Sequence, residues 1–104
     1  MEKIVAQNLL FDFYGELLTE HQQNVYQDAV LEDMSLSEVA DNYGISRQGV
    51  HDLLKRCDKS MQDYEDKLHL ISKFDIIREK IKEIQGLTDD KRVHQLATEI
   101  LEEL

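Results

Sequence analysis

The chain has 104 residues and a net charge of −10, from 12 basic and 22 acidic side chains. This length fits one compact core, and the absence of proline with few aromatic residues favours helices over sheets. The negative charge excludes nucleic-acid binding through the average field of the protein, so such binding would need a local basic patch.

The first helix is expected over residues 3–14, where apolar residues recur at helical spacings. Gly15 follows as a natural left-handed C-terminal cap. Thr19 and Gln22 have the spacing of a capping box, which predicts a second helix over residues 20–31. Ser35 and Glu38 form a second such pair, and they begin a short helix that ends at Tyr43-Gly44.

A long helical segment should follow, because Ser46 can cap a new helix and no breaker occurs before Gly86. Residues 47–84 are expected to form one long helix or two end-to-end helices. Apolar residues recur along its first part every three or four positions: Val50, Leu53, Leu54, Cys57, Met61, Tyr64, Leu68, Ile71 and Phe74. Thr88, with Asp89 and Asp90 near the positive end of a helix dipole, should begin the last helix.

Residues 35–59 have the pattern of a helix-turn-helix. Two helices that cross at a short turn need a small residue at the crossing, which Ala40 supplies, and a residue that accepts positive φ, which Gly44 supplies. Ile45, Val50 and Leu53 supply the apolar underside of the second helix. The spacing of all five residues suits this motif together.

A local basic patch coincides with that second helix. Of the five basic residues in the first 60 positions, four lie within residues 47–59, opposed there only by Asp52 and Asp58. Arg47, Gln48, His51 and Lys55 would face the major groove, where arginine and glutamine can each form two hydrogen bonds to a base edge. Ser46, Arg56 and Lys59 are better suited to phosphate. Asp52 is unfavourable beside phosphate unless it accepts from a cytosine amine. The candidate nucleic-acid-binding residues are Ser46, Arg47, Gln48, His51, Lys55, Arg56 and Lys59.

Five segments resemble the YlxM family of signal-recognition-particle-associated helix-turn-helix proteins, which are similar to sigma factor region 4. They are LFDFYG at 10–15, LLT at 17–19, SLSEVA at 35–40, GISRQGV at 44–50 and YEDKL at 64–68. The resemblance covers about residues 9–74. It implies an all-helical DNA-binding-like fold and a regulatory link to the signal recognition particle, an RNA-containing targeting machine.

We therefore expect an all-α, sigma region 4-like bundle with a long C-terminal helical extension. Residues 1–60 would form the helix-turn-helix region and residues 61–104 the extension, in one continuous domain. A helix over residues 47–74 would extend about 42 Å, longer than the rest of the helix-turn-helix region can cover. The apolar stripe from Cys57 to Phe74 therefore has a core interpretation and an interface interpretation. Length favours a homodimer through residues 57–74 and the C-terminal helix.

The leading functional hypothesis is a non-enzymatic regulatory protein that binds nucleic acid, DNA rather than RNA. The alternative is a protein adaptor that binds signal recognition particle RNA or its GTPases. We expect no metal and no cofactor, because the four histidines are scattered and the single Cys57 has no partner cysteine or nearby base. No apolar run approaches a membrane span, and residues 1–7 carry no targeting pattern, so a cytoplasmic protein is expected.

Overall fold

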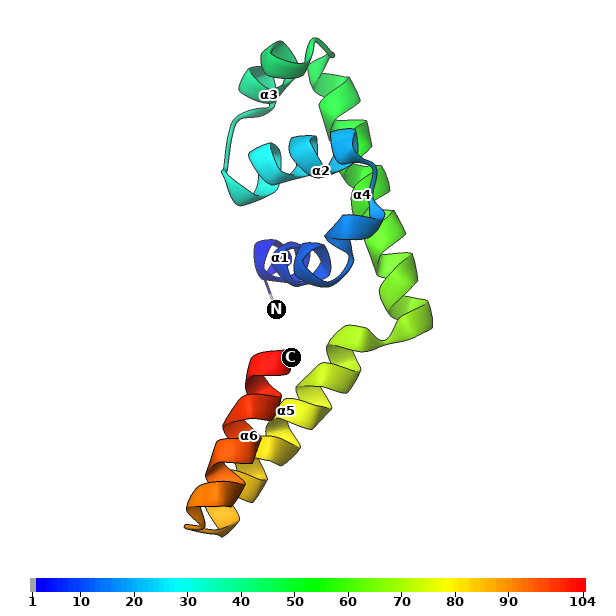
Figure 1. Ribbon diagram of the computed structural model, residues 1–104. Coiled ribbons are helices and arrows are strands. Elements are labelled where there is room, and N and C mark those ends of the chain that lie inside the picture. Colours follow the sequence, from blue (N-terminus) through cyan, green and yellow to red (C-terminus); the bar gives the residue numbers. More distant parts are fainter. Residues whose placement is uncertain (1) are drawn as a thin grey trace. The chain divides into compact units, whose positions relative to one another are not determined.

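A computed structural model describes residues 2–104, and within them every regular element is helical (Figure 1), which confirms the all-α prediction. The chain divides into two compact units, Met1–Leu68 and His69–Leu104, which we call the head and the hairpin. This division falls later than the boundary near residue 60 that the sequence suggested. The elements are α1 (Lys3–Tyr14), η1 (Gly15–Leu17), α2 (Glu20–Tyr26), η2 (Gln27–Leu31), α3 (Leu36–Tyr43), α4 (Arg47–Leu68), α5 (Leu70–Leu87) and α6 (Lys91–Glu103).

Gly15 does not have the left-handed conformation expected of it. Its φ of −57° and ψ of −35° are right-handed, and it begins the 3-10 turn η1 directly after α1. A Cβ atom at this position would lie 2.9 Å from the ring of Phe11. Glycine is therefore needed here for close packing against an aromatic ring and not for a helix cap.

Replacing Gly15 with alanine should destabilise the head by about 1 to 3 kcal/mol, because the added methyl group must displace the Phe11 ring. Gly86 is a matched control, since a Cβ there meets nothing within 4 Å and the residue lies inside α5. Gly86→Ala should raise stability by roughly 0.5 to 1 kcal/mol. Urea denaturation followed by circular dichroism measures both, and equal effects of the two substitutions would contradict this assignment.

The second predicted helix has the expected span but two kinds of turn. The Thr19 side chain accepts from the Gln22 amide N–H at 3.2 Å, and the Gln22 side chain accepts from the Thr19 amide at 3.0 Å, so the capping box is confirmed. The helix is α-helical through Tyr26 and widens into a π-helical turn, η2, to Leu31. Val25 and Tyr26 are fully buried at this junction, so the wider turn follows the part of α2 that enters the core.

Helix α4 is the element on which the head is built, because α1, α2 and α3 all pack against it (Figure 1). Its buried side chains are Val50, Leu53, Cys57 and Met61, and Val39 and Ala40 of α3 are buried with them. Burial raises the pKa of the Cys57 thiol to about 11, with a further contribution from the charge of Asp58. Cys57 and Met61 are each 0% exposed. The interface interpretation of the stripe is therefore wrong for these two residues, which belong to the core of the head.

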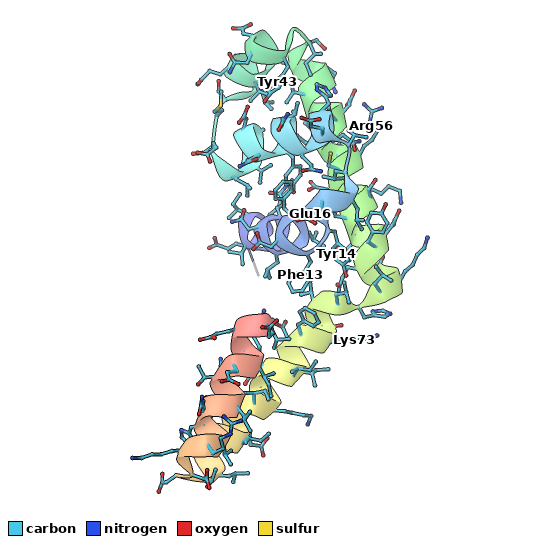
Figure 2. All side chains as sticks on the ribbon, in the orientation of Figure 1. Phe13, Tyr14, Glu16, Tyr43, Arg56 and Lys73 are labelled. Carbon is cyan, nitrogen blue, oxygen red and sulfur yellow. The ribbon has the colours of Figure 1, made fainter. Side chains whose placement is uncertain are left out.

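Tyrosine hydroxyls bonded to carboxylates tie the head helices together. Tyr14 at the end of α1 points toward α4 (Figure 2), where its hydroxyl donates to Glu65 at 2.6 Å. Tyr26 of α2 donates to Asp58 at 2.5 Å. Asp58 and Glu65 are two helical turns apart and therefore lie on one side of α4. These two carboxylates therefore hold α1 and α2 against α4.

The hairpin consists of α5 and α6, which pack against each other. Of the two arrangements expected for residues 47–84, one long helix or two successive helices, the structure has the second: His69, with a φ of +57°, separates α4 from α5. Helix α5 continues through Gly86 to Leu87, so this glycine does not break it. The last helix is capped by Asp90, whose carboxylate accepts from the amides of Arg92 and Val93 at 2.9 and 3.1 Å. Thr88 lies before the helix, and its hydroxyl accepts from the Asp90 amide.

Candidate nucleic-acid interface

The chain folds back at Gly44, as the helix-turn-helix pattern predicts. Gly44 has a φ of +66°, and its amide donates to the Ala40 carbonyl at the end of α3. The amide of Ile45 donates to the same carbonyl at 3.1 Å. A left-handed residue reverses the chain within one turn, and two N–H groups satisfy one terminal carbonyl of α3. The turn therefore brings α4 back across α3.

Ser46 caps the start of α4. Its hydroxyl accepts from the Gly49 amide at 2.9 Å, and its carbonyl accepts from the Val50 amide. A Cβ at Gly49 would lie 3.1 Å from that hydroxyl, so glycine leaves room for the cap. The cap uses the hydroxyl's acceptor role, which leaves its proton available to a phosphate oxygen. At the start of α3, Ser35 caps the Glu38 amide, but Glu38 accepts from the Ser35 hydroxyl and does not complete the expected box.

The remaining candidate residues share the exposed face of α4. Because Val50, Leu53, Cys57 and Met61 occupy the buried face, the polar positions between them point outward. Arg47, Gln48 and His51 are exposed and line a shallow depression together with Leu36 of α3. Lys55, Arg56 and Lys59 are also exposed, one to three turns further along the helix. The face from Arg47 to Lys59 is about 18 Å long at 1.5 Å per residue.

Asp52 organises the first turns of this face. Gln48 donates to its carboxylate at 2.9 Å, and His51 Nδ1 lies 3.6 Å from it. The Gln48 hydrogen bond, together with His51 and Arg56, holds the pKa of Asp52 below its usual range. The carboxylate is therefore charged at neutral pH, in the middle of the basic patch. Gln48 keeps its carbonyl oxygen and one N–H free to approach a base edge.

The basic side chains further along the face differ in how freely they can bind another anion. Lys59 lies 3.4 Å from Asp63 in an exposed i,i+4 pair, which lowers its attraction for another anion. Lys55 and Arg56 form no ion pair with any residue in 2–104. Asp58, which opposes the patch in sequence, accepts from Tyr26 and from Gln7 of α1 and so turns toward the interior of the head. Asp52 is therefore the main carboxylate that lowers the positive charge of the patch.

Two features of this face were missed by sequence reasoning. Leu36 is 39% exposed in the first position of α3, and it supplies the apolar wall of the depression beside Arg47 and His51. In the sequence, the only indication of this role is that an apolar residue occupies the first turn of an amphipathic helix. Tyr43 donates from the end of α3 to Asp28 at 2.5 Å, which fixes α3 against the preceding segment. That pair joins residues 15 apart and has no helical spacing that would have revealed it.

Within residues 2–104, no group of three or more His, Cys, Asp or Glu side chains is arranged to hold a metal ion. Over the same residues, none of the helices has the length and apolarity required to cross a membrane. The face on α4 is the place where the described charges, the turn geometry and an exposed depression coincide.

The fold and this face define the class: an all-α protein with a helix-turn-helix. The chain belongs to the family UPF0122, described as "Putative helix-turn-helix protein, YlxM / p13 like", whose model matches residues 1–102. That description is of a helix-turn-helix protein. The match covers nearly the whole chain and therefore extends beyond residues 9–74, where the sequence resembles the YlxM family.

Curated relatives agree with this membership. UPF0122 protein OB1530 of Oceanobacillus iheyensis is 42% identical over 95 residues, which cover 91% of this chain and 90% of that one. A UPF0122 protein of Desulforamulus reducens is 48% identical over 82 residues, covering 79% and 70%. UPF0122 protein YlxM of Bacillus subtilis is 36% identical over 104 residues, covering 100% and 94%.

Proposed function

We propose that this protein is a cytoplasmic DNA-binding regulatory protein that contacts duplex DNA through the exposed face of α4. The single observation that supports this most is the turn at Gly44, which leaves Arg47, Gln48 and His51 exposed at the start of a helix whose other side is buried. A recognition helix presents its first turns to base edges in the major groove. Arg56 and the Ser46 hydroxyl would then bind phosphates on either side.

The proposal is tested by the salt dependence of binding to random duplex DNA, measured by fluorescence anisotropy. Three to four phosphate contacts require that the logarithm of the affinity falls against the logarithm of salt with a slope of about −3. Structured RNA is titrated in parallel, and a steeper response or tighter binding to RNA would transfer the proposal to RNA. Failure to bind either polymer at low salt would refute it.

An adaptor in the signal recognition particle pathway is the second candidate. It is favoured by the negative charge of α3, the other helix of the helix-turn-helix, where Glu38 and Asp41 are exposed. Carboxylates at this position repel a DNA backbone and suit a basic protein surface. In this case the same face, or the hairpin, would bind the particle's RNA or GTPases. Crosslinking from Gln48 in cells distinguishes the two candidates, because it attaches either nucleic acid or a protein to the same position.

Asp52 gives a direct prediction for the DNA hypothesis. Asp52→Asn removes the charge beside His51 and Arg56 while it keeps an oxygen that can accept from Gln48. Affinity for random duplex DNA at low salt should rise roughly 3- to 10-fold, because one repulsive interaction with phosphate is lost. Asp12→Asn is the control for a general charge effect, since Asp12 is an exposed carboxylate of α1 and not part of the α4 face. Unchanged affinity in Asp52→Asn would show that α4 does not approach phosphate there.

A further inference from the structure

The hairpin has an apolar face that its own two helices do not cover. Only Ile81 and Ala97 are buried in it, and the unit runs from His69 to Leu104, below the roughly 40 residues that usually suffice for a stable core. Ile77, Ile84, Leu96 and Ile100 are each between 39 and 43% exposed. Large aliphatic side chains exposed together on one unit mark a surface that binds a partner.

These side chains share one side of the hairpin. Ile81 and Ile84 of α5 and Val93, Leu96, Ala97 and Ile100 of α6 line a single apolar groove. Ile77 lies one turn before Ile81 and two turns before Ile84, so it extends the same row on α5. The groove therefore runs along the helices between two parallel rows of aliphatic side chains.

Charged side chains border this groove on its two sides. On α5 the lysines lie next to the aliphatic row, and Glu79 and Glu83 share a depression with Lys80. On α5, Lys73 and Lys80 are seven residues apart and lie just beyond Ile77 and Ile84 on the helix surface. Lys73 is in the first turn of α5 (Figure 2), and both lysines are exposed and without an ion pair to any residue in 2–104. On α6, Glu99 and Glu103 are four residues apart and lie beside Leu96 and Ile100 along a shared depression.

The charged residues also occupy matching heights. Ile81 and Ala97 are the buried residues that face each other across the groove, so they set the register of the antiparallel pair. With a rise of 1.5 Å per residue, Lys80 and Glu99 lie within about 2 Å of the same height, and Lys73 and Glu103 within about 3 Å. The two rows are on opposite edges of the face, too far apart to pair within one hairpin.

We propose that this apolar face binds the same face of a second copy of the chain, about a two-fold axis parallel to the helices. This rotation exchanges the edges of the face and preserves height. It places Lys80 and Lys73 of each copy against Glu99 and Glu103 of its mate. The result is a four-helix bundle in which every helix is antiparallel to its neighbours, with an apolar centre and charged edges.

A second two-fold axis could also join the same two faces, but the positions of the lysines favour the parallel axis. A two-fold axis perpendicular to the helices would set α5 against α5 and bring Lys80 close to Lys80 of the mate, because Lys80 is near the middle of the hairpin. Like charges at that separation are repulsive. The helix dipole adds to the argument: α6 has no basic residue in its last turn, where Glu102 and Glu103 are unfavourable unless outside cations approach.

The sequence suggested an interface of residues 57–74 and the C-terminal helix. This dimer keeps the C-terminal helix and replaces the apolar stripe of residues 57–74 by the row from Ile77 to Ile84 of α5. It does not depend on DNA binding, since it involves the hairpin alone. Sedimentation velocity on the full chain at tens of micromolar should therefore report a dimer. Leu96→Asp should raise the dissociation constant at least roughly 100-fold by placing a charge in the apolar centre.

Charge reversal tests the axis itself. Lys80→Glu and Glu99→Lys should each raise the dissociation constant roughly 10-fold, because each creates two like-charged contacts per dimer. An equimolar mixture of the two variants should recover dimer, since both contacts in the mixed pair are then opposite in charge. Lys82→Glu is the control: it makes the same charge change on the other side of α5, where Lys82 lies near Glu79, and should leave the dimer intact.

Circular dichroism checks that each variant keeps its helical content. A monomer of the unmodified chain at all concentrations would overturn the proposal. So would a dimer that is indifferent to Leu96→Asp, or one that weakens with Lys80→Glu and is not recovered by mixing.

Discussion

Replacing Asp58 with alanine is expected to lower the free energy of unfolding of the head by about 2 to 4 kcal/mol. Asp58 accepts from the Tyr26 hydroxyl at 2.5 Å and from the Gln7 side-chain amide at 3.0 Å. Tyr26 is fully buried, so its hydroxyl has no water to replace the lost acceptor. The same burial, with the hydrogen bond and charge of Asp58, raises the pKa of Tyr26 well above its usual value.

Two further variants distinguish the loss of these hydrogen bonds from the loss of a negative charge. Asp58→Asn keeps an oxygen at the same position and should lose less than half as much stability. Asp63→Ala removes an exposed carboxylate two positions after Met61 and should change stability by less than about 0.5 kcal/mol. Urea denaturation monitored by circular dichroism measures all three variants. If Asp58→Ala and Asp63→Ala had equal effects, the hydrogen bonds that Asp58 accepts from Tyr26 and Gln7 would not hold the head together.

The helices were predictable where a local rule decides them. Residues 3–14 and the capped turns at Thr19, Ser46 and Gly44 depend on contacts within four residues, which spacing along the chain reveals. Gly15 is a residue whose role such local rules do not predict. Its sequence context suits a cap, and only the Phe11 ring packed against it explains why no side chain is present. The break at His69 has no such local signal, because neither glycine nor proline occurs there.

The candidate site was predictable as a face but not as a set of contacts. Apolar residues recur every three or four positions in this segment, so the sequence places Arg47, Gln48, His51 and Lys55 on the outer side of α4. The structure has them there. The sequence could not show that Asp58 turns inward to Tyr26, because the two are 32 residues apart. It treated Asp52 as a charge that opposes phosphate or accepts from cytosine, whereas the Gln48 amide is bonded to it. The electrostatics of the face depend on both of these contacts.

Arg47 and Arg56 should differ in what they contribute to DNA binding. Arg47 begins α4 beside the depression, whereas Arg56 lies more than two turns further along the helix, at the level of α2 (Figure 2). Arg47→Ala should weaken binding to a preferred duplex about 5- to 150-fold and reduce its preference over random DNA, because a bidentate base contact is lost. Arg56→Ala should weaken both duplexes by the same factor and reduce the salt slope by about 1.

The preferred duplex is obtained by selection from a random pool with the unmodified protein, and anisotropy is then measured at several salt concentrations. Lys3→Ala is the matched control, since it removes one positive charge from α1 and leaves the α4 face intact. If Arg47→Ala and Lys3→Ala bound the preferred duplex equally well, the start of α4 would not read DNA. If Arg47→Ala lost affinity for both duplexes equally, with a lower salt slope, Arg47 would contact phosphate, and base recognition would have to come from Gln48 and its neighbours on the same face.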